Sequence, residues 1–188
     1  MRSLLALPLA VVLLALGACA SAPEVRTTAP EPGGIAGAYA WVPDRSGMAA
    51  NPLNNADVWR GAVREAVEKE LARRGYPKGE LRGARFVMAF HFVVRADDGT
   101  VTVVDNYFGY DAPGVRAHLD AYVKANVPTR GRQGTLVIDA VDPVAKRLLW
   151  RGSATTAIDP SLTVEARRRA IDRLVASILA EFPGGASR

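Results

Sequence analysis

Residues 84–96 constrain the fold more than any other stretch, because their side chains alternate over the length of a long β-strand. Successive side chains of a strand point to opposite faces of the sheet. The predicted strand carries Phe86, Met88, Phe90, Phe92 and Val94 on one face and Val87, Ala89, His91 and Val93 on the other. Asp98-Gly99 follows it and is typical of a two-residue hairpin loop. Residues 101–107 are therefore predicted to return antiparallel to this strand.

A second hairpin is predicted over residues 134–156. With residues 142–146 as its loop, Asp139 pairs with Leu149 and Val137 pairs with Arg151. This register places Leu136, Ile138 and Ala140 on the same face as Leu148 and Trp150. Arg151 is then diagonal to Asp139, and we expect a salt bridge between them rather than a buried catalytic acid.

Residues 54–75 and the segment after Thr163 have the spacing of amphipathic helices. Asn54 or Asn55 caps the first helix, and Gly75 stands where a left-handed C-cap belongs. Thr163 caps the second helix, which ends at 183–185. The apolar stripes consist of Trp59, Val63, Val67 and Leu71 in the first helix and of Ile171, Leu174, Val175, Ile178, Leu179 and Phe182 in the second.

Residues 38–42 alternate aromatic and small side chains and are predicted as the first strand. The element order is then β-α-ββ-ββ-α. This order predicts one α+β domain over residues 38–183, with a mostly hairpin, antiparallel sheet and two amphipathic helices packed on one face. Residues 184–188 form a tail. Residues 109–132 fit either a short helix near 115–122 or a strand near 122–127 followed by a loop.

The first eighteen residues have the pattern of an export signal. Arg2 precedes an unbroken apolar run over residues 4–16, which is shorter than the ~20 residues of a membrane-spanning helix. The small residues Gly17 and Ala18 follow the run and precede Cys19. Residues 20–37 are rich in Pro, Ala, Gly and Thr and are predicted to form a flexible tether.

Leu16-Gly17-Ala18-Cys19 resembles the lipobox of bacterial lipoprotein precursors. The resemblance implies that Cys19 carries lipid, becomes the first residue of the mature protein and holds it on a membrane. Ala20 follows the cysteine where Asp would direct retention in the inner membrane, so we expect the outer membrane, facing the periplasm. The alternative is cleavage by an ordinary signal peptidase after Ala20, which would release a soluble protein.

Cys19 is the only cysteine, so the lipidated protein has no thiol for catalysis, disulfides or zinc binding. The 24 Lys and Arg residues are dispersed along the chain and give it a formal net charge of +5 against 19 Asp and Glu residues. This charge predicts solubility and a mild preference for anionic surfaces, and no nucleic-acid partner is expected.

The second hairpin carries most of a family resemblance. Its residues Gly134, Leu136, Asp139, Asp142, Trp150, Arg151 and Gly152, with Tyr39-Ala40-Trp41 early in the domain and Phe182-Pro183 at its end, resemble the domain of unknown function 4136 family of bacterial lipoproteins. The resemblance spans about residues 38–183. It implies no established activity and brings no catalytic residues.

No set of residues predicts catalysis, a metal site or a cofactor. The two histidines, His91 and His118, lack the spacing of metal ligands, and we expect both to be structural. Phe108, Tyr110 and Asp111 form the candidate binding surface, because aromatic rings with polar ends in a loop suit contacts with a glycan or a protein.

These observations predict a non-enzymatic, membrane-tethered periplasmic module that binds a protein, glycan or lipid of the cell envelope. Two other classes stay open. An envelope hydrolase would use Asp or His residues in contact with one another on the sheet's open face. A lipid-handling accessory would expose an apolar groove between the sheet and its helices.

Overall fold

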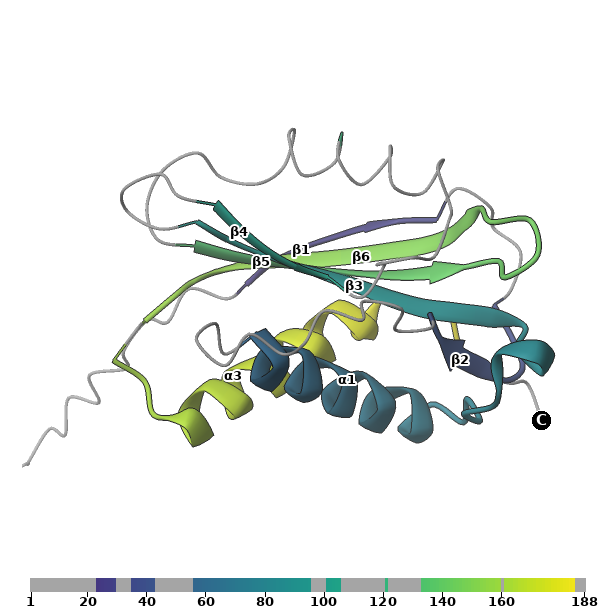
Figure 1. The fold of residues 1–188 in the computed structure, drawn as a ribbon, viewed down its shortest axis with the longest axis horizontal. Helices are drawn as coiled ribbons and strands as arrows, with labels where there is room; N and C mark the ends of the chain where they lie inside the picture. The colour runs from purple at the N-terminus through teal and green to yellow at the C-terminus, as the bar shows by residue number, and fades with distance from the viewer. Residues whose placement is uncertain are drawn as a thin grey trace, which may run out of the picture.

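The computed structural model describes residues 23–29, 35–42, 56–95, 101–105, 121, 133–159 and 161–184. Within these ranges six strands form one sheet: β1 (Glu24–Thr28), β2 (Tyr39–Trp41), β3 (Phe86–Arg95), β4 (Val101–Asp105), β5 (Gln133–Val141) and β6 (Leu148–Ala157). Helices α1 (Ala56–Arg73) and α3 (Val164–Ala180) lie on one face of the sheet (Figure 1), and a short 3-10 helix (Leu81–Gly83) precedes β3. The predicted α+β class and element order are confirmed, with β1 added in front.

Three strands pair with β3. Along one edge, β5 pairs antiparallel with it from Val87↔Val141 to Arg95↔Gln133. Along the other edge, β4 pairs antiparallel with the second half of β3, and β2 pairs parallel with its first three residues. β6 then pairs with β5, and β1 pairs with β6. Both predicted hairpins are thus present. The two-residue loop predicted at Asp98-Gly99 is wrong, because it would pair Arg95 with Thr102, whereas Arg95 pairs with Val101.

The helix caps that the structure describes lie where the sequence predicts them. Thr163 Oγ1 accepts a hydrogen bond from the backbone N–H of Ala166 (3.2 Å) at the start of α3. Gly75, after α1, has a φ of 80°. Its N–H donates to the carbonyl of Ala72 (3.0 Å), and the next N–H donates to the carbonyl of Leu71 (3.0 Å). This pair of bonds is a Schellman motif, which a glycine adopts without steric cost.

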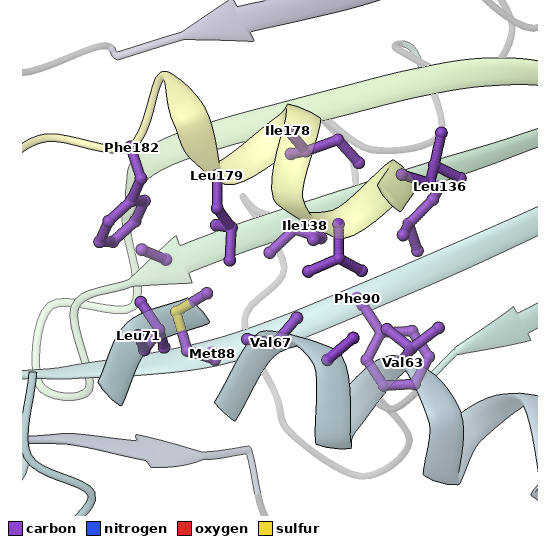
Figure 2. Close-up of a cluster of buried hydrophobic side chains, with 14 of the residues drawn as sticks. Val63, Val67, Leu71, Met88, Phe90, Leu136, Ile138, Ile178, Leu179 and Phe182 are labelled. Atoms are coloured by element: carbon purple, nitrogen blue, oxygen red, sulfur yellow. The ribbon is translucent and has the colours of Figure 1, made fainter. Parts of the chain in front are cut away.

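The main core lies between the helices and the Phe-rich face of the sheet (Figure 2). Its members in Figure 2 are Val63, Val67 and Leu71 of α1, Met88 and Phe90 of β3, Leu136 and Ile138 of β5, and Ile178, Leu179 and Phe182 of α3 and the turn after it. Trp150 of β6 meets Phe182 edge to face, with 4.8 Å between ring centroids. The apolar stripes predicted for both helices are therefore the ones that pack on the sheet.

The opposite face of the sheet is buried as well. Val87 and Ala89 of β3 form a smaller apolar cluster with Ala40, Val42 and Val141. His91 lies on the same face of β3 and is 2% exposed. Burial on both faces explains why β3 carries apolar residues at nearly every position.

The prediction of a flexible tether over residues 20–37 is wrong for residues 24–28. These residues form β1, which pairs antiparallel with β6 from Glu24↔Thr155 to Thr28↔Arg151. Val25 packs against the main core, whereas the other side chains of β1 are exposed. Backbone pairing with β6 holds the strand, and side-chain composition does not reveal such pairing.

The register predicted for the β5–β6 hairpin is wrong by two residues, because Asp139 lies opposite Arg151 and not Leu149. One residue of this difference comes from the loop. The prediction pairs Val141 with Arg147. In the structure the N–H of Asp142 donates to the carbonyl of Arg147 (2.9 Å), and Val141 lies opposite Leu148, one residue further along β6.

The second residue of the difference comes from a β-bulge between Ala140 and Val141. Trp150 keeps its predicted place on the core face, opposite Ala140. Leu148 leaves the core face, because on the loop side of the bulge it lies opposite Val141 and packs with the smaller apolar cluster on the opposite face of the sheet. A bulge adds a residue to one strand only, and nothing in the alternation of this segment indicates where it falls.

The predicted export signal and, apart from residue 121, the alternatives for residues 109–132 lie outside the described residues. In the part of the chain that the structure does describe, no helix is both long enough and apolar enough to cross a membrane.

Gly152→Ala is expected to destabilise the fold by about 1–3 kcal/mol, as overpacking of a dense core does. A Cβ at Gly152 would overlap the Trp150 ring and lie 2.7 Å from Ile178 Cγ2. Urea unfolding measures the change. The matched control is Gly61→Ala in α1, where nothing lies within 4 Å of the added methyl group. That control is expected to be neutral or to stabilise by up to about 1 kcal/mol. Equal effects of the two substitutions would contradict the packing role of Gly152.

Candidate functional site

Asp142 shapes the loop between β5 and β6. Its Oδ1 accepts hydrogen bonds from the backbone N–H groups of Val144 (2.8 Å) and Ala145 (2.9 Å). The bond from Ala145 contributes most to lowering the pKa of the Asp142 carboxyl, and the bond from Val144 and the charge of Arg147 lower it further. Asp142 therefore acts as a charged turn former, as its position before Pro143 predicts.

Asp139 and Arg151 form a buried ion pair on the face of the sheet opposite the helices, called here the second face. Arg151 donates from Nε to Asp139 Oδ1 (2.7 Å) and from Nη2 to Asp139 Oδ2 (2.6 Å). The Arg151 side chain is 3% exposed and that of Asp139 is 0% exposed. The expected salt bridge is confirmed, between residues directly opposite each other rather than diagonal. Because the pair is bidentate and uses both carboxylate oxygens, we assign it a structural role.

The two motif glycines mark points where large side chains approach the backbone. Gly152, opposite Ile138 near the middle of the hairpin, makes room for Trp150 and Ile178. Gly134 leaves room for side chains near the open end of the hairpin, where a Cβ would lie 2.9 Å from Phe92 Cζ and 2.9 Å from Ile158 Cδ1. These two neighbours of Gly134 both border a cavity.

This apolar cavity, of about 270 Å³, is lined by residues from the end of β6 and from the N-terminal halves of α1 and α3. The end of β6 and the starts of both helices lie toward the same end of the fold (Figure 1). Phe92, Ile171 and Leu174 form the buried part of its lining. The half-buried part is formed by Trp59, Ile158, Leu162 and Ala170. Thr156, Ala157, Asp159 and Arg167 complete the lining. A concave, mostly apolar site with a few polar groups is the usual form of a small-ligand site.

Trp59 connects the cavity to the core. It lies near the start of α1 and stacks on Phe92 of β3, with 5.7 Å between ring centroids and 26° between ring planes. Only one side of a stacked ring is covered by its partner. A half-buried tryptophan beside an apolar cavity therefore offers a flat hydrocarbon surface to a ligand.

Sequence reasoning did not identify this cavity. The helical spacing assigns Trp59, Ile171 and Leu174 to core stripes, and it gives no sign that the first turns of α1 and α3 leave a space between them. The one available signal is Ile158-Asp159-Pro160-Ser161-Leu162, where two large apolar residues stand in the turn between strand and helix. Both of these residues line the cavity.

Glu68 attaches the edge strand β2 to α1. Its Oε1 accepts hydrogen bonds from Trp41 Nε1 (2.8 Å) and Lys78 Nζ (2.6 Å), and the Arg64 guanidinium lies 4.9 Å from the centroid of the Trp41 ring. Burial raises the pKa of Glu68, but the hydrogen bonds from Lys78 and Trp41 and the charges of Lys78 and Arg64 outweigh it and lower the pKa. The Tyr39-Ala40-Trp41 part of the motif thus holds an edge strand in place.

The predicted lipidation site, Cys19, and the predicted binding surface, Phe108, Tyr110 and Asp111, lie outside the described residues, as does His118. They stay predictions. The structure places His91 on the buried second face. Among the residues that the structure describes, no three His, Cys, Asp or Glu side chains are grouped so as to hold a metal ion.

Asp139→Asn is expected to destabilise the fold by about 3–5 kcal/mol, because it leaves the buried Arg151 charge without its carboxylate. The double variant Asp139→Leu/Arg151→Met removes both charges and is expected to be much closer to wild type. Urea unfolding of the two variants measures the difference. If Asp139→Asn kept wild-type stability, the ion pair would not have the structural role that its geometry indicates.

Glu68→Gln is expected to lower stability at pH 7 by less than about 1 kcal/mol, since the Lys78 side chain is half exposed. The pKa of Glu68 is lower in the folded protein than its ordinary value of 4.5, so its charge stabilises the fold above that value. The contribution is lost as the pH falls through the folded-state pKa. Urea unfolding between pH 7 and pH 3 should therefore show the difference between wild type and variant shrinking below about pH 4.5. A difference that is constant over this range would contradict it.

Two solved structures resemble the chain at low sequence identity. A PelC dodecamer from Paraburkholderia phytofirmans is 11% identical with a TM-score of 0.44, and the alignment covers 87% of this chain and 99% of that one. A PDZ domain protein from Parabacteroides distasonis is 12% identical with a TM-score of 0.47, and the alignment covers 85% of this chain and 35% of that one.

None of the curated proteins matches the sequence significantly. The sequence profile described as domain of unknown function DUF4136 matches residues 35–184. The matched region begins at Ile35, a buried core residue, and ends just after Phe182, which packs on Trp150. It therefore contains the helix-covered core and the cavity, and it covers most of the chain. This protein belongs to the DUF4136 family.

Proposed function

We propose that this protein is a membrane-anchored, non-enzymatic binding module of the bacterial cell envelope, and that the apolar cavity is its ligand site. The observation that carries the proposal is the cavity itself. Its lining combines buried Phe92, Ile171 and Leu174 with the half-buried side chains of Trp59 and Leu162. Such a lining excludes water from one part of a ligand while the partly exposed residues give access from the surface.

The anchor rests on the sequence. The export signal over residues 1–18 and the lipobox-like Leu16-Gly17-Ala18-Cys19 support lipidation of Cys19. A diacylglyceryl group plus an amide-linked chain would attach the protein stably, where a single chain binds only marginally. Ala20 supports the outer membrane as the destination. A ligand site for apolar molecules suits a protein that works beside lipid.

The cavity favours lipid handling over the hydrolase alternative. A hydrolase on the sheet's second face would need a carboxylate available to act as acid, base or nucleophile. The buried Asp139 uses both oxygens to bind Arg151. The surface of Phe108, Tyr110 and Asp111 stays a proposed second contact, for a glycan or protein partner.

Native mass spectrometry of protein extracted from membranes tests both parts of this proposal. Wild type is expected to begin at Cys19 with a covalent lipid mass and to carry a non-covalent apolar adduct. Cys19→Ser is expected to lose the covalent mass and the membrane fraction but to keep the adduct. Ala170→Phe places a ring in the cavity and should lose the adduct.

The matched control for the cavity is Ala180→Phe, which adds the same ring at an exposed position on the same helix. It is expected to keep the adduct. A wild-type chain without covalent lipid would refute the anchor, and an adduct unaffected by Ala170→Phe would refute the cavity as the ligand site.

A further inference from the structure

We propose that the cavity binds one acyl chain of a membrane lipid taken directly from the bilayer, and that β1 holds the cavity at the bilayer surface. This inference rests on the proposed anchor at Cys19 and on the cavity as ligand site. It adds the chemical class of the ligand, its source and the element that positions the site.

The size and lining of the cavity define the ligand class. An apolar cavity of about 150 Å³ holds one benzene molecule. In proportion, the 270 Å³ of this cavity hold a hydrocarbon segment of about ten carbon atoms. Most of the lining is carbon, including the rings of Trp59 and Phe92. This is the space of one acyl chain segment rather than of a lipid headgroup.

The charges at the cavity do not select a headgroup. Asp159 Oδ1 accepts hydrogen bonds from the N–H (2.8 Å) and the hydroxyl (2.6 Å) of Ser161. These bonds, and the charge of the neighbouring Arg167, lower the pKa of Asp159. A carboxylate and a guanidinium thus stand together in the lining and offset each other's charge. We therefore expect the hydrocarbon chain to enter and the headgroup to stay outside.

The N-terminal chain enters the sheet beside the cavity. Glu24, the first residue of β1, lies opposite Thr155 of β6. Thr156, the next residue of β6, lines the cavity. Because β1 and β6 are antiparallel, the chain that precedes Glu24 leaves the sheet at the same end as the cavity. Val164, the first residue of α3, is 56% exposed at this end and adds apolar surface.

The length of chain between anchor and sheet sets the distance to the membrane. Five residue steps separate Cys19 from Glu24, and at 3.3–3.6 Å each they span at most about 18 Å. This reach is close to the thickness of the hydrocarbon of one leaflet, about 15 Å, which is half of a bilayer core. Without β1, the tether would run twenty residues to Tyr39 and allow an extension of about 70 Å. Pairing of β1 with β6 removes this slack.

Quenching of Trp59 fluorescence by brominated lipid tests the proposal. The lipidated wild type is reconstituted in phosphatidylcholine vesicles with brominated or plain acyl chains, because bromine quenches a tryptophan that it touches. We expect quenching that is lost in Trp59→Phe and in Ala170→Phe and kept in Ala180→Phe. Ala157→Phe, at an exposed lining position at the end of β6, blocks the cavity in a second way without adding a tryptophan, should Ala170→Phe not fold.

The role of β1 is tested by tether length. Inserting ten Gly and Ser residues between Ser21 and Ala22 lengthens the tether from about five to about fifteen residues. Effective concentration falls as roughly the −3/2 power of length, so the lipid dependence of quenching should weaken by about fivefold. The same ten residues added after Arg188 serve as the control and should change nothing. Equal quenching with both insertions would refute the positioning role of β1.

A soluble arm separates the inference from the proposed function. Cys19→Ser, which carries no lipid, is mixed with brominated dodecanoate in solution. Quenching there, without quenching of anchored wild type in vesicles, would refute the bilayer as source while the cavity remained a ligand site. If dodecanoate quenched Cys19→Ser but not anchored wild type, the cavity of wild type would already be filled by the lipid on its own Cys19, and the bilayer would not be the source. No quenching in either arm would refute the cavity as a ligand site and the acyl-chain inference with it, as would equal quenching of Ala170→Phe and Ala180→Phe in vesicles.

Discussion

Burial of one sheet face under α1 and α3 is the interaction on which the rest of the structure depends. Each helix has one apolar stripe, and β3, β5 and β6 present a matching face, so the two layers exclude water only when packed together. Packing is tight at the end where Trp150 meets Phe182 and Gly152 leaves no room for a methyl group. At the other end, between Trp59 and Ile171, the layers leave the cavity. One interface thus contains both a tightly packed end and the candidate site.

The second face of the sheet follows a different principle. Among the residues that the structure describes, a small apolar cluster forms there, and the same face carries the polar Asp139–Arg151 pair on adjacent strands. A buried ion pair adds little net stability, because desolvation offsets most of its attraction. In its bidentate geometry Asp139 and Arg151 stand directly opposite each other, between the bulge and the open end of the hairpin. The pair therefore selects the bulged register over one without the bulge, in which a buried charge would lose its partner.

The sequence predicts those parts of the fold that local patterns determine. Gly75 and Thr163 set helix ends through hydrogen bonds within one turn, and the alternation of β3 follows from burial on both sides. Pairing between distant segments leaves weaker signals. β1 has a single half-buried apolar residue, Val25, and depends on backbone bonds to β6, so its composition resembles a linker. The parallel pairing of β2 with β3 also has no local signature.

The candidate site is less predictable than the fold for the same reason. A cavity forms where the apolar stripes of two helices do not touch, and the helical spacing of a sequence describes each stripe separately. Trp59 and Ile171 have the pattern of ordinary core residues, and only the packing of the N-terminal halves of the two helices places them beside an open space. The sequence places Gly134 and Gly152 in the hairpin but does not reveal their role, because each leaves room for large side chains that approach its backbone.

In the proposed exchange of an acyl chain with the bilayer, the distance of the cavity from the lipid would matter more than its affinity for the chain. A ten-carbon chain moved from water into the cavity would gain about 8 kcal/mol, at 0.8 kcal/mol per methylene. A chain that leaves a bilayer gains almost none of this, because lipid tails are as apolar as the lining. Exchange between bilayer and cavity is then nearly balanced, and occupancy is governed by how closely the cavity is held to the lipid. With the proposed anchor at Cys19, that distance would be set by the five residue steps from Cys19 to Glu24, and the pairing of β1 with β6 would keep it short.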